Sequence, residues 1–546
     1  MYVLGIGGSE HDFSATLIKD GEILCSIEDE RLTRSKYSLQ KDLSITPLAK
    51  EWRSIQYCLD QADITLNEID CFFGNDLMNK DYIPQLPKQI VMLNHHLTHA
   101  ASTYYTSPYN DAAILVVDGI GTLIDSSSNT HETISLYKGT NNEIKDIGKV
   151  HGSGIENPVS GWTLFENSIG RFYYRVTAEI GFGFLEEGKT MGLAPYGKET
   201  YVGDFKRFYS IDGYIFRQSH EQKLEMVVYI RNVLKNTKDR FHTTADLAYA
   251  VQHHLEQIMI SICNALYDIT QSKNLCLAGG VALNSVANLK VLENTPFENI
   301  YVQPASGDAG TSIGAALYGF HVLNNKPRED LNNLFSPYLG KNYSEREMLD
   351  SLDKHGNLIN IEKPDDYVDA VAKLLTKGSI IAWFNGRSEI GPRALGNRSI
   401  LVDPRRKDMK DILNKRVKHR EGFRPFAPIV LEEYQTEYFE LEHPSYYMLL
   451  VPKIKIDKQD KIPAVTHADG TGRVQTVSNK LNPQLHALVS SFYKQTGVPV
   501  LLNTSFNDNG EPIVESPEDA LNCFLKTDID YLVINGFIIS KKVLDN

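Results

Sequence analysis

The chain opens with Y-V-L-G-I (residues 2–6), S-A-T-L-I-K (14–19) and E-I-L-C-S-I (22–27), three apolar runs in close succession. Apolar and polar residues alternate in the outer runs, as they do in strands with one buried face. Asp20-Gly21 separates the second run from the third, and Asp-Gly is a strong hairpin signal. The stretch therefore predicts a sheet that begins as three strands joined by short turns.

Strand and helix signals alternate through the rest of the chain. Apolar strands are predicted at Ala112–Val117, Leu275–Leu277 and Ile380–Phe384, and helices at Thr243–Leu266, from Asn284 onward and at Asp366–Thr376. Residues 324–344 are rich in Asn, Pro, Gly and Ser, which indicates a linker. Because 546 residues are too many for one core, we predict two α/β domains, residues 1–340 and residues 350–546.

The composition excludes several classes of protein. The formal net charge of −13 argues against a protein that grips the nucleic-acid backbone, which needs a basic face. No apolar run approaches the about 18 residues of a membrane span, and Met1-Tyr2-Val3 begins no basic leader. Six scattered cysteines without a C-x-x-C pair are typical of buried thiols in a reducing compartment. We expect a cytoplasmic protein that binds neither nucleic acid nor membrane.

Two histidines and two aspartates form a candidate metal site. His95 and His99 are four residues apart, which places both imidazoles on one face of a helix. Asp118 ends an apolar strand and precedes a glycine, and Asp308 has the same character, as expected where ligands enter α/β sheets. Such a mixed N/O set favours ferrous iron, manganese or magnesium. A histidine pair satisfied within the core or at the surface is an equally common alternative.

Three glycine-rich segments, Gly5–Gly8, Gly279-Gly280 and Gly307–Gly310, lie next to predicted strands or helices. Such turns let backbone N–H groups approach phosphates. None is a Walker A loop or a G-x-G-x-x-G fingerprint, and each alone reads more simply as an ordinary turn. Together they suggest a nucleotide cleft in the first half of the chain.

The second half carries a concentrated positive charge. Between Arg387 and Arg424 there are twelve Lys or Arg residues and five Asp or Glu residues. Charge runs are usually solvated faces, but these arginines are interleaved with turn and packing residues such as Gly391-Pro392. Because Arg suits bidentate phosphate recognition, we expect a pocket for ATP and a second phosphorylated molecule. Asn503 and Asn507 could read an amide or carbamate, or could form a polar turn after a strand at Val498–Leu502.

These motifs, in this order, resemble the NodU/CmcH family of O-carbamoyltransferases. The resemblance rests on H-H-L-T-H-A (95–100), V-V-D-G-I-G (116–121), E-G-K-T-M-G-L-A (187–194), G-G-V-A-L-N (279–284), S-G-D-A-G (306–310) and, most specifically, G-R-S-E-I-G-P-R-A-L-G-N-R-S (386–399). It covers nearly the whole chain, with a local departure at Ser388-Glu389-Ile390. It implies an N-terminal actin-like ATPase domain, similar to the tRNA threonylcarbamoyl transferase, and a C-terminal YrdC-like α/β domain.

The resemblance also implies roles for individual residues. It assigns the divalent metal to His95, His99, Asp118 and Asp308, and the nucleotide to Lys189, Gly279, Gly280, Asn284, Arg398 and Asn507. It assigns carbamoyl phosphate and the adenylate to Arg393, Lys418, Arg424, Arg473, Asn503 and Ser505, with His11, Arg424 and Lys418 catalytic. A histidine titrates near neutrality and can take a proton from an alcohol, although His11 could instead be a turn residue that caps the backbone.

The implied activity is ATP-dependent carbamoyl transfer from carbamoyl phosphate to a hydroxyl of a small-molecule acceptor, a natural product or a sugar. The implied cofactors are ATP, Mg²⁺ and a divalent metal, Fe²⁺ by resemblance with Mn²⁺ as the alternative, and a homodimer is one open state. Residues 126–129 and 156–175 are the segments expected to choose the acceptor. A threonylcarbamoyl or hydrogenase-maturation transferase, a sugar or acetate kinase, and an actin-like ATPase that acts as a binding module are the competing interpretations.

Overall fold

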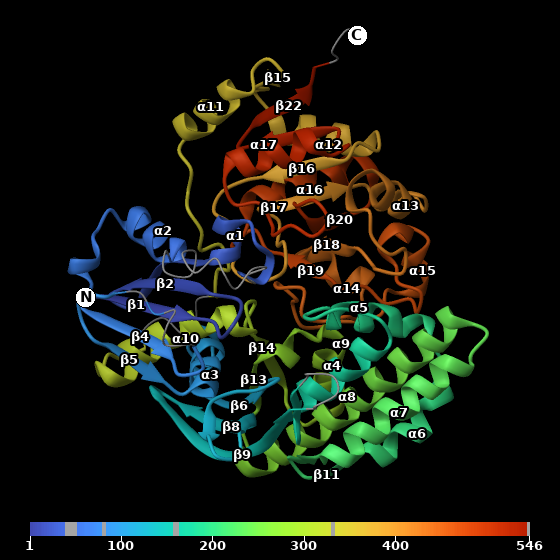
Figure 1. Cartoon of the computed structure of the whole chain (residues 1–546). Helices are drawn as coiled ribbons and strands as arrows, with labels where there is room; N and C mark the ends of the chain where they lie inside the picture. The colour runs from blue at the N-terminus through green and yellow to red at the C-terminus, as the bar shows by residue number, and fades with distance from the viewer. Residues whose placement is uncertain (39–51, 79–82, 84, 157–162, 329–333, 543–546) are drawn as a thin grey trace. The chain divides into compact units, whose positions relative to one another are not determined.

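The computed structural model describes all residues except 39–51, 79–82, 84, 157–162, 329–333 and 543–546 (Figure 1). The chain forms two compact units. Unit 1 comprises Met1–Leu24 and Ser44–Phe335, and unit 2 comprises Cys25–Leu43 and Ser336–Asn546. Each unit is built around its own mixed sheet or sheets with helices packed against them, which is the α/β architecture predicted from the sequence.

Besides a two-stranded ribbon, β11 (Ser210–Asp212) and β12 (Ile215–Arg217), unit 1 contains two larger sheets with the same internal plan. In the first, β1 (Tyr2–Gly7) pairs antiparallel with β2 (Ser14–Lys19) and parallel with β4 (Cys71–Asn75), which is followed by β5 (Ile90–Leu93). The strand order is β3-β2-β1-β4-β5, with β3 at Glu22–Glu28. The three opening strands predicted from the sequence are therefore confirmed.

The second sheet repeats that plan. Its centre, β6 (Asp111–Val117), pairs antiparallel with β8 (Thr130–Thr140) and parallel with β13 (Asn274–Ala278), which pairs parallel with β14 (Asn299–Val302). With β9 (Glu143–Glu156) beyond β8, the order β9-β8-β6-β13-β14 matches the order of the first sheet. A doubled sheet of this order is the actin-like ATPase arrangement that the sequence resemblance implied.

Glycines allow helix α10 (Thr311–Tyr318) to pack tightly between β1 and α3 (His95–Thr106). A Cβ on Gly5 would lie 2.1 Å from the Ser312 carbonyl oxygen, and one on Gly7 would lie 2.3 Å from the Ser312 nitrogen. Both glycines lie inside β1, so their lack of a side chain serves this close approach. The first glycine-rich segment is therefore largely a packing feature, and only Gly8, with φ of 115°, leaves the strand in a left-handed turn.

Unit 2 contains one sheet of eight strands in the order β15-β22-β21-β16-β17-β20-β18-β19, in which the first three are β15 (Ile359–Glu362), β22 (Phe537–Lys541) and β21 (Tyr531–Ile534). Its central strands are β16 (Ile381–Phe384), β17 (Arg398–Val402), β20 (Val500–Ser505) and β18 (Ala427–Leu431), and β19 (Gln475–Val477) lies at one edge. Helices α12 (Tyr367–Thr376) and α16 (Pro483–Thr496) pack against each other. The strand that we predicted at Val498–Leu502 begins and ends later, so Asn503 and Ser505 belong to β20 and not to a turn.

One segment from the first part of the sequence belongs to unit 2. Cys25–Leu43 clusters there, whereas the predicted first domain, residues 1–340, would include it. The physical reason is a set of hydrogen bonds across more than 360 residues of sequence: the Arg31 guanidinium donates to the Gly391 carbonyl (2.6 Å), and the Gly391 N–H donates to Glu28 (2.5 Å). Glu28 and Arg31 are buried, so this segment fixes the loop that carries Arg393.

Other sequence predictions are confirmed in detail. The long helix predicted at Thr243–Leu266 is α8 (Arg240–Thr270), and the helix predicted from Asn284 is α9 (Ser285–Asn294). The six cysteines are free thiols, five of them buried. Among the helices of the described residues, none is both long and apolar enough to cross a bilayer.

Candidate metal centre and anion-binding site

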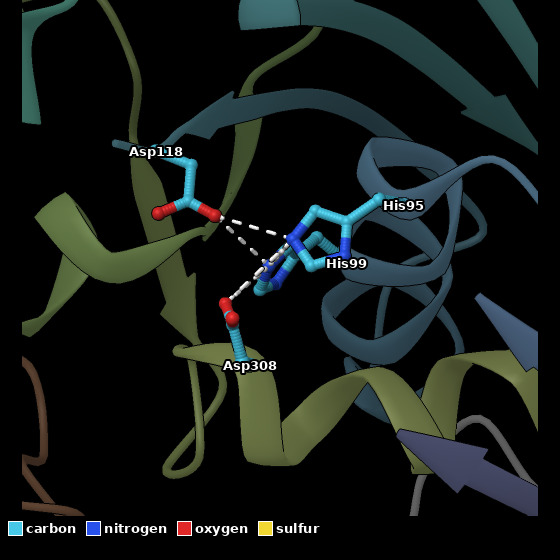
Figure 2. A group of neighbouring side chains, drawn as sticks. All are labelled: His95, His99, Asp118 and Asp308. Atoms are coloured by element: carbon cyan, nitrogen blue, oxygen red, sulfur yellow. Dashed lines mark hydrogen bonds and ion pairs between the residues drawn. The ribbon is translucent and has the colours of Figure 1, made fainter. Parts of the chain in front are cut away.

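Four buried side chains of unit 1 converge on one point (Figure 2). His95 and His99 lie in the first turns of α3, whose N-terminus is capped by the Asn94 side chain accepting from the Leu97 N–H. Asp118 directly follows β6, and Asp308 begins the short 3₁₀ turn η9 (Asp308–Gly310) before α10. The predicted grouping of these residues at strand and helix ends is what the structure shows.

The distances fit a coordination shell. His95 Nε2 lies 3.3 Å from Asp118 Oδ2 and 3.6 Å from Asp308 Oδ1, and His99 Nε2 lies 3.4 and 3.5 Å from the same two oxygens. The two Nε2 atoms are 3.2 Å apart, and all four ligand atoms lie within 4.8 Å of one another. A first-row ion with bonds of about 2.1 Å spaces its ligands about 3.0–3.4 Å apart, so the cluster could close around such an ion with small shifts.

Electrostatics shows that this cluster is built to hold positive charge. Burial alone would lower the pKa of His95, but hydrogen bonds and the charges of Asp118 and Asp308 raise it to about 10. Burial would raise the pKa of Asp118, but its contacts with His95 and His99 hold it well below the usual range for a carboxyl group. Because two facing imidazole nitrogens repel when both are neutral, a proton or a metal ion must lie between these groups.

A second layer of residues orients the four side chains. The His95 Nδ1–H donates to Asn75 Oδ1 at 3.0 Å, which leaves the Nε2 lone pair facing the cluster. The Ser9 hydroxyl donates to Asp308 Oδ2 (2.5 Å), and the N–H groups of Gly119 (2.7 Å) and Gly280 (3.3 Å) donate to Asp118 Oδ1. Each carboxylate therefore has one oxygen fixed by the protein and the other directed into the cluster.

His11 follows β1 in the same unit. Its Nδ1–H donates to Asp12 at 3.0 Å, which leaves Nε2 free to accept a proton, and its ring lies 5.7 Å from the Phe184 ring. Burial would lower the pKa of His11, but Asp12, Asp308 and Asp118 raise it to about 9. The field of the Asp118 and Asp308 carboxylates therefore reaches His11.

The residues assigned to the nucleotide in unit 1 have defined local roles. Gly279 has φ of 89°, and a Cβ there would lie 2.3 Å from the Val117 carbonyl oxygen, so only glycine fits beside the end of β6. Asn284 caps α9 through the Ala287 N–H and exchanges hydrogen bonds with Gln252. Lys189, in α5 (Glu187–Leu193), pairs with Glu186 at 2.7 Å. In the structure, the side chains of Asn284 and Lys189 are bonded to these protein partners. Their contact with a nucleotide therefore stays a prediction.

Unit 2 brings four arginines together, with the Glu421 carboxylate 3.8 Å from the Arg424 guanidinium. Burial and the neighbouring Arg424 charge lower the pKa of Arg393 to about 10 and that of Arg420 to about 9. Burial lowers the pKa of Arg473 well below its usual range, and the charges of Arg393, Arg420 and Arg424 lower it further. The Nε atoms of Arg393 and Arg473 are buried and have no hydrogen-bond partner among the described residues. Buried cations whose charges lower the pKa values of their neighbours in this way form a site for an anion.

Lys418, Ser505 and Asn507 form one hydrogen-bonded group. The Lys418 ammonium donates to the Ser505 carbonyl (2.7 Å), the Asn507 carbonyl (3.0 Å) and Asn507 Oδ1 (2.6 Å). Lys418 ends the short helix η11 (Asn414–Lys418), and burial together with Arg420 lowers its pKa to about 7. The lysine therefore links the basic segment to the end of β20.

Asn503 and Arg398 differ in how much of each side chain remains available. Asn503 Nδ2 donates to the Ala394 carbonyl (2.9 Å), next to Arg393, while its Oδ1 is buried without a partner among the described residues. The fully buried Arg398 donates to the carbonyls of Asn385, Gly386 and Asn397 and lies over the Phe384 ring at 3.6 Å. Asn503 can still accept from a ligand, whereas Arg398 holds the loop after β16 and keeps one buried nitrogen, Nη2, without a partner among the described residues, so its nucleotide contact stays a prediction.

Sequence reasoning did not single out three residues at these sites. Asn75 and Ser9 orient metal ligands from 20 and 299 residues away in the sequence, so no local motif marks them. Arg420 was one of twelve basic residues in its segment, and only the fold shows that it shares the anion site with Arg424 and Arg473.

Comparison with known proteins identifies the family. Residues 80–317 match the sequence profile "Carbamoyltransferase N-terminus", and residues 372–541 match "Carbamoyltransferase C-terminus". The nodulation protein NolNO of Sinorhizobium fredii is 37% identical over 97% of this chain and 79% of its own length. An uncharacterised Synechocystis protein is 33% identical over 99% of this chain and 97% of its own.

Among solved structures, HypF in its phosphate- and nucleotide-bound form aligns with a TM-score of 0.40 and 14% identity, over 59% of this chain and 55% of that one. This similarity is too weak to support a fold assignment, so the assignment for unit 1 rests on its own strand order. Because two profiles together match most of the sequence, and a relative 37% identical spans nearly all of it, this chain is an enzyme of the carbamoyltransferase family.

Proposed function

We propose that the enzyme is an ATP-dependent O-carbamoyltransferase that divides its reaction between the two units. Unit 2 would convert carbamoyl phosphate and ATP into carbamoyl-adenylate, and unit 1 would transfer the carbamoyl group to a hydroxyl. The observation that carries this proposal is that unit 2 gathers more cations than nearby carboxylates, whereas unit 1 gathers candidate metal ligands within range of a histidine.

In unit 2, water would first hydrolyse carbamoyl phosphate to carbamate and phosphate. The carbamate oxygen would then attack the α-phosphorus of ATP, with Mg²⁺ on the phosphates, to give carbamoyl-adenylate and pyrophosphate. Arg393, Arg424 and Arg473 could neutralise the charge that develops on the phosphoryl oxygens. The free Asn503 Oδ1 could accept from the carbamoyl NH₂ group.

In unit 1, the buried donor set of two imidazoles and two carboxylates suits a divalent ion such as Fe²⁺, with Mn²⁺ as the alternative. Such an ion would supply Lewis-acid stabilisation of the phosphate that leaves. It would also offset the charge of Asp118 and Asp308, so we expect the pKa of His11 to fall from about 9 toward neutrality in the loaded enzyme. His11 Nε2 could then take the proton of the acceptor hydroxyl as its oxygen attacks the carbamoyl carbon, which yields an O-carbamate and AMP.

The acceptor would be a hydroxyl of a small molecule, a natural product or a sugar. Of the two segments expected to select it, residues 157–162 lie outside the described residues. A sugar or acetate kinase is the main rival function, because it would also use an actin-like domain with carboxylates and glycine turns. It would leave the arginine cluster of unit 2 without a role.

The nucleotide product separates these two functions. Purified enzyme with labelled ATP, Mg²⁺ and carbamoyl phosphate, but no acceptor, should form AMP and pyrophosphate only when carbamoyl phosphate is present. A matched variant, Arg424→Ala, should lose this reaction, whereas Arg416→Ala should keep it, because Arg416 is paired with Asp530 at 2.6 Å. ADP formed regardless of carbamoyl phosphate would refute the proposal and support a kinase.

A further inference from the structure

Arg171 lies beside the metal cluster, in the first turn of α4 (Ile169–Glu179). The N-cap residue Ser168 accepts from the Arg171 N–H at 3.1 Å and donates to the Gly119 carbonyl at 2.6 Å. The Arg171 Nε atom lies 3.5 Å from the position that a Cβ on Gly119 would occupy. Since Gly119 directly follows the candidate metal ligand Asp118, the guanidinium lies next to the backbone that carries this ligand.

The Arg171 guanidinium is fixed in place, but no carboxylate neutralises it. It lies over the rings of Phe165 (5.7 Å) and Tyr174 (5.9 Å), and its Nε is buried. Within the described part of the chain it makes no hydrogen bond or ion pair, although Glu187 lies within electrostatic range. Arg175, one turn further along the same helix, is paired with Glu179 at 2.5 Å. The contrast within one helix indicates that Arg171 is kept available for a ligand.

Charge balance indicates the sign of that ligand. A divalent ion among two carboxylates and two neutral imidazoles has a net charge near zero, so it does not by itself compensate a bound phosphate. Neighbouring cations are already engaged: Lys189 with Glu186 and Lys149 with Glu132. Arg171 offers the missing positive charge, with a planar fork that matches two phosphate oxygens.

We propose that Arg171 binds the phosphate of the adenylate in unit 1 and holds it against the metal ion while the carbamoyl group is transferred. This inference rests on the proposed function, because it is carbamoyl-adenylate that brings a phosphate to this site. Phe165 and Tyr174 act as positioning residues that keep the guanidinium planar and directed.

AMP binding to protein loaded with Mn²⁺ tests the inference without any acceptor. The relaxation of the AMP phosphorus signal by Mn²⁺ reports only AMP whose phosphate lies at the metal cluster, so binding in unit 2 does not interfere. Arg171→Ala should weaken this binding roughly ten- to hundredfold, the effect of losing a charge-assisted bidentate contact, and Arg171→Lys should lose less. The matched control Arg175→Ala should stay within about twofold, because the Arg175 guanidinium is already paired with Glu179.

Equal AMP affinity in the wild type and Arg171→Ala, or no relaxation of AMP by Mn²⁺ in the wild type, would overturn the inference. Arg171→Lys keeps the positive charge and guards against a fold defect in the alanine variant. Carbamoyl-phosphate-dependent exchange of pyrophosphate into ATP should be the same in Arg171→Ala as in the wild type. Absence of that exchange in the wild type would refute the proposed function itself. Equal AMP affinity in the wild type and Arg171→Ala would refute only the role of Arg171, so the two results are distinguishable.

Discussion

The two sites hold charge in opposite ways. In unit 1, His95 Nε2 lies 3.3 Å from Asp118 Oδ2, so groups of opposite charge contact one another around one central point. In unit 2, the charge of Arg424 lowers the pKa values of Arg420 and Arg473, and the positive charges outnumber the nearby Glu421 carboxylate. Unlike charges in contact leave room for a cation or proton between them, whereas like charges that remain together require an anion. The sign of the missing partner can thus be derived from the protein alone.

The largest expected effect is in unit 2. Arg420→Ala should lower carbamoyl-phosphate-dependent AMP formation roughly 10²–10³-fold, as expected when one donor to a developing oxyanion is lost. Because the variant also removes a cation that repels its neighbours, the ligand-free protein should unfold at a higher temperature. Steady-state assays and thermal unfolding check the two parts. Unchanged activity would show that Arg420 lies outside the anion site.

A ligand deletion in unit 1 should have a comparable effect on metal content. His99→Ala should reduce the affinity for the divalent ion by more than about 100-fold, because it removes a residue that binds the ion directly. Loss of a residue that only hydrogen-bonds to a metal ligand already costs about 10–100-fold. His96→Asn is the matched control, since His96 is the buried neighbour on the same helix but bonds to Ser135 at 2.8 Å. Elemental analysis after dialysis gives the result, and equal metal loss in both variants would contradict the assigned ligand set.

Substitution of a residue that orients a candidate metal ligand should have a smaller effect on metal affinity. Ser9→Ala should weaken metal binding about tenfold, because Asp308 would keep its place but lose the donor that fixes Oδ2. A competition titration with a chelator measures the affinity. An affinity equal to that of the wild type would mean that the hydrogen bond from Ser9 does not orient the ligand.

The smallest effect concerns pH. Burial and Arg420 lower the pKa of Lys418 to about 7, so in the ligand-free protein it is protonated below pH 7 and neutral above. An anion prefers the protonated form, so pyrophosphate affinity should fall by up to about tenfold per pH unit above 7. Between pH 7 and its ordinary pKa the unfolded chain carries the extra proton, so this residue makes stability rise with pH.

Calorimetric titration of pyrophosphate at several pH values measures the effect on Lys418. Lys418→Arg, which stays charged, should flatten the profile. A profile equally steep in that variant would assign the pH dependence to another group.

Local sequence signals predicted the candidate metal ligands but not the residues that surround them. The spacing of His95 and His99 and the position of Asp118 after an apolar run are local properties, and the structure confirms their grouping. Asn75 and Arg171 reach the cluster only because separate strands and helices pack together. Asn503 was expected near a strand end but lies within β20, because cross-strand pairing with Leu401 and Ala427 continues through it.

The most direct test of the division between the units is carbamoyl-phosphate-dependent exchange of labelled pyrophosphate into ATP, which requires no acceptor. We predict that His11→Ala and His99→Ala keep this exchange within about threefold of the wild type, while Arg424→Ala loses it roughly 10²–10³-fold. Exchange that persists in Arg424→Ala, or that disappears in the two histidine variants, would contradict the assignment of adenylate formation to unit 2 and carbamoyl transfer to unit 1.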